Sequence, residues 1–272
     1  MTVVVCVKPV PEPQAWRAEP VDPSRGTPRR EGIPLVLSPG DRRAIELALG
    51  LSAGVLCLAM GPPEAEAALR QGLAVGATRA VLVSDRRFAG ADTLLTARVL
   101  ALAVGRLGAG LVLCGGESPD SGTGSVPVQL GTLLGWPVFT AMYGIGPVQG
   151  EGARAGSGYV LECRMESGLL RMVVEPPLVG ALHASATPLR SLSPAGIVKA
   201  RGRPLEVWDA ATLGWEGPAQ PYTSMLGWER TPVVSQAEML PGDWEEAARL
   251  LAGFLRQAVP PARGDGGEAR GA

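Results

Sequence analysis

Short runs of apolar, β-branched residues alternate with longer segments of helical periodicity through the first half of the chain. The short runs predict strands at residues 2–8, 54–60, 79–85 and 109–116. The longer segments predict helices over residues 38–52, 62–76 and 91–107. Strands that alternate with helices are typical of right-handed βαβ units and of a parallel sheet covered on both faces. The pattern therefore predicts an α/β protein with a doubly wound, mostly parallel, Rossmann-like sheet.

The pattern changes after Trp136. Extended runs predict a strand at 138–145, a hairpin over 158–175 that turns at Ser167-Gly168, and another strand at 176–183. Residues 184–240 show no long period and many prolines, which predicts an extended arm that docks on a partner chain. The large apolar residues expected to make that contact are Trp208, Trp215, Tyr222, Met225, Leu226 and Trp228.

The end of the chain returns to a helical pattern. The segment 242–259 predicts an amphipathic helix capped by Asp243, followed by a loose tail. The expected organisation is thus an α/β domain at 1–183, a partner-binding arm at 184–240, and a C-terminal helix and tail at 241–272.

Composition narrows the range of functions. The chain has 272 residues, 46% hydrophobic and 19% charged, with a formal net charge of -1. This gives enough apolar material for one substantial core and no basic surface for nucleic-acid phosphates. No apolar segment of membrane-spanning length is free of arginine, and the four cysteines show no C-x-x-C spacing. We expect a cytoplasmic protein without a membrane span or a bound metal.

One stretch has the composition of an anion-binding loop. Residues 114–125, CGGESPDSGTGS, follow a predicted strand and precede a helix that begins near Ser125. Free N–H groups from Ser125 to Val128 and the helix dipole would face the Gly122-Thr123-Gly124 turn. The alternative is a glycine-rich connection that only turns the chain. The loop is neither a Walker A sequence nor the dinucleotide fingerprint, and Asp120 fits a turn residue as well as a ribose ligand.

Two further turns fall at predicted strand ends, at residues 37–43 and 57–63. Three such turns at one sheet edge favour a mononucleotide pocket over purely structural turns. No nucleophile, base and orienting group occur together, and the lone His183 lacks partners in the sequence. We therefore expect a carrier rather than a catalyst with its own active-site nucleophile or base.

Several segments together resemble one family. They are VVVCVKPVP, SPGDRRAIELAL, MGPPEAEAALRQGLAVGATRAVLVSD, LVLCGGESPDSGTGSVPVQLGTLLGWP, GIVKARGRPLEV and the hairpin ECRMESGLLRMVVEPPLVGA. Their order and spacing over residues 2–214 resemble the beta subunit of electron transfer flavoproteins, of which this chain would be a divergent member. The resemblance implies a heterodimer with an alpha subunit that holds most of the FAD, while the beta subunit buries AMP, or a second FAD in bifurcating relatives.

The resemblance also implies a set of nucleotide contacts. In this chain they are Cys6, Ser38, Pro39, Gly40, Asp41 and Met60, then Ser118, Asp120, Ser121, Gly122, Thr123, Gly124, Ser125, Val126 and Val128.

The chain departs from the family pattern at several of its characteristic positions. Ser38 replaces an asparagine, Ser125 replaces a glutamine, and Gly116 replaces a lysine. The family's dehydrogenase-docking loop is LHASATPLR here, with Ser185 in place of the anchoring leucine. This predicts that the usual acyl-CoA-type dehydrogenases are not recruited and that the protein has one dedicated flavin dehydrogenase or none.

Two other functions compete with that of an electron carrier. A stand-alone module that binds or senses an adenine nucleotide would keep the fold and lose the redox partner. An ATP-using enzyme would need a lysine and an acidic cluster for metal-phosphate chemistry, and the sequence offers no such motif.

Overall fold

The structure is a computed structural model. It describes residues 2–12, 21–22, 27–28, 32–52, 54–148, 158–186, 192–224, 226, 237 and 239–258. The chain divides into two compact units, Met1–Trp228 and Glu229–Ala272. All the strands among the described residues belong to the first unit, and the second unit contains the helix α6 (Trp244–Ala258).

A nine-stranded sheet forms the centre of the first unit, in the order β11-β10-β9-β12-β8-β1-β6-β7-β13. The strands are β1 (Val3–Cys6), β6 (Val55–Met60), β7 (Arg79–Val83), β8 (Leu111–Gly115), β9 (Val138–Pro147), β10 (Tyr159–Met165), β11 (Gly168–Val174), β12 (Leu178–Leu182) and β13 (Leu205–Trp208). Neighbours from β9 to β13 in this order run parallel, whereas β10 is antiparallel to both β9 and β11. The predicted mostly parallel sheet is confirmed.

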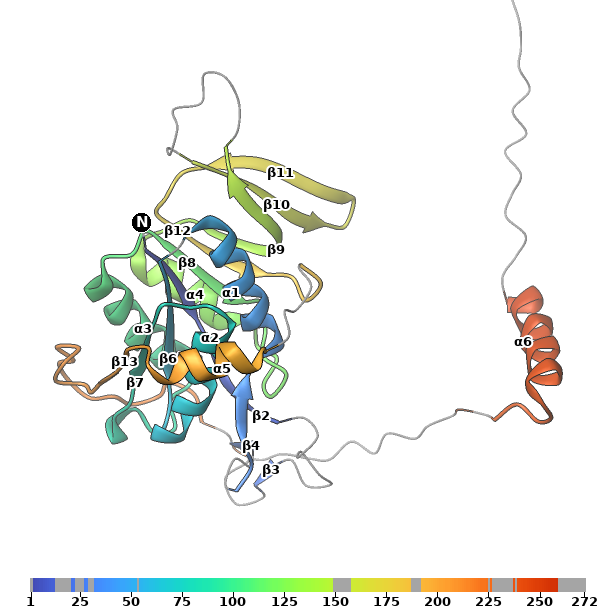
Figure 1. The fold of residues 1–272 in the computed structure, drawn as a ribbon, viewed down its shortest axis with the longest axis horizontal. Coiled ribbons are helices and arrows are strands. Elements are labelled where there is room, and N and C mark those ends of the chain that lie inside the picture. Colours follow the sequence, from blue (N-terminus) through green and yellow to red (C-terminus); the bar gives the residue numbers. More distant parts are fainter. Residues whose placement is uncertain are drawn as a thin grey trace, which may run out of the picture. The chain divides into compact units, whose positions relative to one another are not determined.

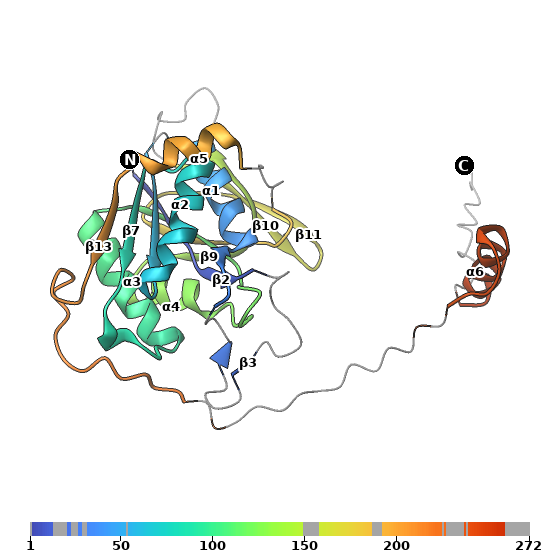
Figure 2. The ribbon, with the colours of Figure 1, turned by 60° about the horizontal axis from the view of Figure 1, so that its bottom comes forward.

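Helices cover both faces of this sheet. They are α1 (Pro39–Leu51), α2 (Glu66–Val75), α3 (Thr93–Leu107), α4 (Ser125–Leu134) and α5 (Pro194–Arg201), with short 3-10 turns η1 (Pro63–Ala65) and η2 (Arg86–Phe88). Figures 1 and 2 show α1, α2 and α5 on one face and α3 and α4 on the other. Alternate residues of β1 follow this division, since Val3 and Val5 pack with α1 and α2 while Val4 and Cys6 pack with α3. Both faces are buried, as a doubly wound fold requires.

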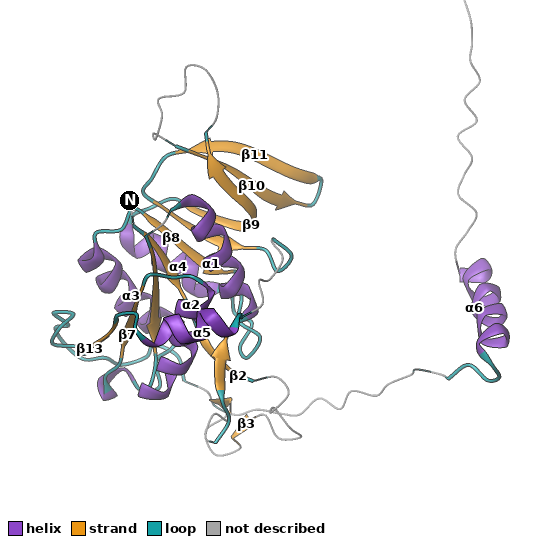
Figure 3. Cartoon of the chain, in the orientation of Figure 1, coloured by secondary structure: helices purple, strands orange, loops and turns teal. Residues whose placement is uncertain are grey.

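Two small features were not predicted from the sequence. The connection between β1 and α1 contains β2 (Pro9–Pro11), which pairs antiparallel with β5 (Leu35–Leu37). It also contains the two-residue pair β3 (Val21–Asp22) and β4 (Thr27–Pro28). The predicted hairpin is present: Met165 pairs with Gly168 across a turn at residues 166–167 (Figure 3).

The predicted extended arm is partly regular structure that belongs to the first unit. The helix α5 packs on α2, and β13 extends the sheet by pairing with β7. Trp208 and Trp215 were expected to dock on a partner, but they are only 9% and 8% exposed and lie in the core of this unit. The sequence pattern did not indicate these elements, because a four-residue strand and an eight-residue helix are too short to show a period. Tyr222 and Leu226 are exposed, whereas Met225 and Trp228 lie outside the described residues.

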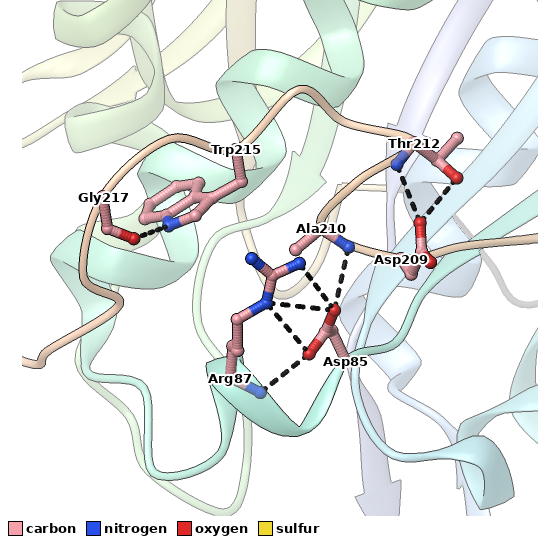
Figure 4. A network of polar contacts seen from close by, with 7 residues as sticks. All are labelled: Asp85, Arg87, Asp209, Ala210, Thr212, Trp215 and Gly217. Carbon is pink, nitrogen blue, oxygen red and sulfur yellow. Dashed lines mark hydrogen bonds and ion pairs between the residues drawn. The ribbon is translucent and has the colours of Figure 1, made fainter.

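Carboxylates fasten the segment that follows β13, residues 209–224, which we call the strap. Figure 4 shows Asp85 accepting hydrogen bonds from the amide of Ala210 and from Arg87, and Asp209 accepting from Thr212. The ring of Trp215 makes an edge-to-face contact with Phe88, at 5.2 Å between centroids. Hydrogen bonds and aromatic packing thus hold the strap at both its start and its middle.

Asp92 fastens the far end of the strap. One carboxylate oxygen accepts from Leu95 N at 2.8 Å and caps α3. The other accepts from Tyr222 N at 2.8 Å and Thr223 N at 2.9 Å. A single carboxylate therefore begins a helix and holds a segment 130 residues away in sequence.

The helix α6 begins where the sequence predicts. Its cap is Asp243, whose carboxylate accepts from the amides of Glu245 and Glu246. Trp244, Leu251 and Phe254 are exposed on this helix. Within the described part of the chain, no helix has both the length and the apolar character needed to cross a membrane.

We expect Asp92→Ala to lower the free energy of unfolding by about 1–3 kcal/mol, because it removes a helix cap and three further hydrogen bonds, from Tyr222 N, Thr223 N and the Thr223 hydroxyl. Amide hydrogen exchange at Tyr222 and Thr223 should accelerate, as mass spectrometry of the strap would show. Asp209→Ala is the control, since Asp209 caps a turn at the other end of the strap. Unchanged exchange at residues 222–223 in Asp92→Ala would contradict this account.

Candidate functional site

The candidate site lies at the carboxyl ends of β1 and β8, which are neighbours in the sheet. The helix that follows β1, α1, packs on one face, and the helix that follows β8, α4, packs on the other. Such a reversal is a topological switch point, where open α/β sheets place their ligands. The predicted turns at residues 37–43 and 114–125 come together at the carboxyl ends of β1 and β8.

A buried carboxylate joins the elements of this junction. Asp41, in the first turn of α1, is 6% exposed and accepts from Lys8 N at 2.7 Å and Gly115 N at 2.9 Å. A Cβ at Gly115 would lie 2.6 Å from the Asp41 carboxylate, and a Cβ at Gly40 would lie 3.3 Å from Gly115 Cα. Glycine is therefore required at residue 115, and Gly40 permits the close approach of α1 to β8.

Burial changes the titration of Asp41. Loss of hydration raises its pKa from 3.8 to about 6, against the opposing effect of the two backbone hydrogen bonds. The charge of Lys8 lowers this pKa and the charge of Asp120 raises it. The carboxylate is therefore electrostatically linked to both of these residues.

Lys8 is the residue of this site that sequence reasoning missed. Its ammonium donates to Asp120 Oδ1 at 2.6 Å, Ser121 Oγ at 2.8 Å and Ser118 Oγ at 3.0 Å. The side chain of Asp120 is only 1% exposed, so it points toward Lys8 rather than toward solvent. A signal was present, because Lys8 is one of two lysines in the chain and follows a strand at the predicted ligand edge.

The glycine loop ends at an uncapped helix. Gly122 and Gly124 both have a φ of 58°, and Gly124 is the N-cap of α4 with no side chain to accept from the first amides. The Ser125 hydroxyl donates to Thr123 O, and Val126 follows in the first turn. A Cβ at Gly124 would lie 3.3 Å from Gly116 O. This geometry offers backbone N–H groups and a helix dipole to an anion.

Ser38 adds a second unsatisfied group. It occupies the N-cap position of α1, as predicted, but its side chain does not cap the helix. The residue is 1% exposed, and its hydroxyl has no hydrogen-bond partner among the described residues. Buried hydroxyls are normally paired, so Ser38 and the open start of α4 fit a polar ligand with an anionic group.

The predicted residues Cys6 and Met60 lie on the α3 and α4 face. Cys6 pairs in register with Cys114, and hydrogen bonding to Cys6 together with burial raises the pKa of the Cys114 thiol. This raised pKa favours the protonated thiol and does not favour a nucleophile. Met60 ends β6, the neighbour of β1, and packs half-buried on the same apolar cluster.

The lone histidine, His183, follows β12 (Leu178–Leu182). The ring of His183 stacks on Tyr143 at 4.8 Å, and its Nδ1 accepts from Ser185 N. No group of three or more His, Cys, Asp or Glu side chains among the described residues could hold a metal ion. The arrangement is suited to binding and orienting a ligand.

A surface hollow of about 290 Å³ lies elsewhere, over β9, β10 and β11. Its lining includes Gly144, Gly146 and the exposed ion pair of Glu162 with Arg171. We place the candidate site at the glycine loop instead, because this loop leads into the uncapped start of α4 at the switch point.

The fold and this junction define a doubly wound α/β protein with a glycine-rich helix start at its switch point. A profile described as "Electron transfer flavoprotein domain" matches residues 29–213. The chain therefore belongs to the electron transfer flavoprotein family.

Three relatives show how far the similarity extends. The electron transfer flavoprotein subunit beta of Clostridium acetobutylicum is 31% identical over 268 residues, which cover 94% of this chain and 98% of the relative. The caffeyl-CoA reductase-Etf complex subunit CarD of Acetobacterium woodii is 33% identical over 220 residues, 79% of this chain and 80% of the relative. Protein FixA of Azorhizobium caulinodans is 32% identical over 260 residues, 92% and 88% respectively.

The raised pKa of Asp41 predicts a specific pH dependence of stability. The folded protein keeps the Asp41 proton up to about pH 6, whereas the unfolded chain releases it near 3.8. The stability linked to this proton is present below about pH 4 and is lost as the pH rises through 6, a difference of roughly 3 kcal/mol. Urea unfolding from pH 4 to pH 7.5 should show this loss in wild type but not in Asp41→Asn.

Asp209→Asn is the matched control. Hydrogen bonds from Thr212 lower the pKa of this exposed carboxylate, so its contribution has the opposite sign. Identical pH profiles for wild type and Asp41→Asn would show that Asp41 does not titrate as described.

Proposed function

We propose that this chain is the beta-type subunit of an electron transfer flavoprotein, which binds AMP, or FAD, and pairs with an FAD-bearing alpha subunit. Family membership over most of the chain supports the electron-transfer role. The single observation that carries the ligand assignment is the uncapped start of α4 at the switch point, and the unpaired hydroxyl of Ser38 at the start of α1 supports it.

The residues that would hold the nucleotide come from three turns. The phosphate would meet the amides of the α4 start, and the Ser38 hydroxyl would bond the nucleotide from the α1 side. The remaining proposed contacts are Cys6, Pro39, Gly40, Asp41, Met60, Ser118, Asp120, Ser121, Gly122, Thr123, Gly124, Ser125, Val126 and Val128. Flavin supplies the redox chemistry when it is bound, while the protein binds, orients and shields it.

Exposed apolar side chains support an obligate partner. On β11, Leu169 is 58% exposed and Val173 is 67% exposed. In the second unit, Leu251 and Phe254 are 50% and 55% exposed on α6. Apolar groups collected in this way mark protein interaction surfaces. Within residues 184–240, by contrast, the proposed partner-binding segment is shorter than that range, because β13, Trp208 and Trp215 are folded into the first unit.

Dehydrogenase recruitment is proposed to be restricted. Ser185 is exposed and offers no apolar anchor, and residues 187–191 of this loop lie outside the described residues. A buried aliphatic anchor at an interface contributes about 2 kcal/mol, or roughly thirtyfold in affinity. We infer one dedicated flavin dehydrogenase or none.

The deciding experiment is to purify the chain from its native cells, denature it and identify the released nucleotide and any second chain by mass. The proposal expects AMP or FAD together with a flavin-bearing alpha chain. A colourless monomer or homodimer that releases an adenine nucleotide would indicate the stand-alone binding module instead. The absence of any nucleotide would refute the ligand assignment.

Gly124→Val should remove most of the thermal stabilisation that AMP confers. A β-branched residue resists the φ of 58° at this position, and its Cβ would crowd Gly116 O. The readout is the change in melting temperature on adding AMP, since ligand stabilises by mass action whatever the starting stability. Gly105→Ala on α3 is the control, because its Cβ would meet open space. An AMP-dependent shift as large as in wild type would argue against phosphate binding at the start of α4.

A further inference from the structure

We propose that Gln71 is a positioning residue for the nucleotide site, because its side chain fixes the backbone that leads into Ser38 and so orients the Ser38 hydroxyl toward the ligand. This inference rests on the proposed nucleotide site and adds a residue to it. Gln71 lies on α2, outside the three turns that would hold the nucleotide. It would act through Ser38 without contacting the nucleotide.

The strand that ends just before Ser38, β5, turns one amide away from its partner strand. β5 pairs antiparallel with β2, and Leu37 lies opposite Pro9. Glu12 N donates to Pro34 O at 3.0 Å, which makes Glu12 and Pro34 a hydrogen-bonded pair. Hydrogen-bonded and non-hydrogen-bonded pairs alternate along an antiparallel ladder, so the pair of Pro9 and Leu37, three positions along, is non-hydrogen-bonded. The Leu37 amide therefore points away from β2.

Gln71 supplies the acceptor for this amide. Its Oε1 atom accepts from Leu37 N at 3.0 Å. Leu37 is only 3% exposed and belongs to the same apolar cluster as Leu69 and Leu73 of α2. A buried amide that loses its acceptor costs more free energy than an ordinary hydrogen bond contributes. The helix α2 thus provides both the apolar packing and the polar contact that hold the end of β5.

Hydrogen bonds on both sides hold the backbone of Ser38. Before it, Leu37 N is bonded to Gln71, and after it, Ser38 O accepts from Arg42 N at 3.0 Å as α1 begins. Ser38 is held at a φ of -54° and a ψ of 137°, where its side chain does not cap α1. Its hydroxyl, in a residue that is 1% exposed, has no partner among the described residues and is available to a ligand.

Loss of the acceptor at residue 71 would change the direction of this hydroxyl. The Leu37 amide would need water or another acceptor, and a shift of β5 toward one would move Ser38 as well. A serine released from this conformation is also free to accept from the first amides of α1, as N-cap serines normally do. Either change removes the hydroxyl from the ligand. Affinity for AMP should therefore depend on the acceptor at residue 71.

The test measures AMP affinity by calorimetry for the full chain and three variants, Gln71→Met, Gln71→Glu and Arg70→Met. Gln71→Met keeps a side chain of similar length without the acceptor and should bind AMP about fivefold more weakly, as expected for the loss of one hydrogen bond. Gln71→Glu keeps the acceptor and should stay within about twofold of wild type in about 0.15 M salt, which screens the added charge.

Arg70→Met is the matched control. Arg70 precedes Gln71 on α2 and holds this helix at a different place, because it donates to Glu66 and to the carbonyl oxygens of Ala200 and Arg203. Arg70→Met should lower the melting temperature at least as much as Gln71→Met does, yet it should bind AMP as wild type does. The comparison separates a loss of stability from a loss of positioning.

Three results would overturn the proposal. Equal AMP affinity in Gln71→Met and wild type would show that the contact with Leu37 does not matter for binding. A Gln71→Glu variant as weak as Gln71→Met would show that the acceptor is not the important feature. An equal loss of affinity in Arg70→Met would show that any weakening of α2 has the same effect.

Two NMR signals of the nucleotide-free protein provide a readout that does not depend on AMP. In Gln71→Met, amide hydrogen exchange at Leu37 should accelerate and the Cβ chemical shift of Ser38 should change, whereas both signals should stay as in wild type in Gln71→Glu and Arg70→Met. If wild type binds no AMP, the proposed nucleotide site fails, and these signals still decide whether Gln71 orients Ser38. Unchanged signals in Gln71→Met would reject that role.

Discussion

The junction at the switch point depends on one buried carboxylate. Asp41 accepts from the backbone at the ends of both β1 and β8, and it does so from the first turn of α1. A carboxylate this deeply buried is costly in its charged form, and the raised pKa reflects that cost. The hydrogen bonds that Asp41 receives join α1 to the ends of β1 and β8, which are distant from one another in sequence.

The other features of the site follow from the position of Asp41. Because Asp41 binds the backbone of β8 from α1, a side chain at residue 115 would collide with the Asp41 carboxylate, so this residue must be glycine. A Cβ at the next residue, Gly116, would collide with the Leu182 carbonyl oxygen. Gly122 and Gly124 then take left-handed conformations that deliver the chain to an uncapped α4. Lys8, whose backbone is bound to Asp41, pairs through its side chain with Asp120. Backbone geometry and charge compensation together produce an edge suited to an anionic ligand.

Sequence patterns predicted the elements that are long or strongly periodic. The alternating strands and helices, the hairpin, the start of α4 and the capped α6 were all correct, because each has a local signal in apolar spacing or capping residues. The glycine loop was found for the same reason, since its composition is local.

Features that depend on contacts between distant residues were not predictable in this way. The role of Lys8 is defined by partners more than 100 residues away, so its position after a strand at the ligand edge did not by itself reveal these contacts. The burial of Trp208 and Trp215 depends on β13 joining the sheet edge and on α3 beneath the strap. Ser38 carries a capping signal, yet its hydroxyl is unpaired because the Asp41 and Gly115 contacts set the helix start.

The most direct test of the account follows the backbone amides of the full chain during titration with AMP, by two-dimensional NMR of 15N-labelled protein. Binding at the switch point predicts saturable shifts that are largest at Gly122, Gly124, Ser125 and Val126, with a second group around Ser38. No shifts, or shifts centred on the hollow beside Glu162 and Arg171, would contradict the assignment of the nucleotide to the glycine loop.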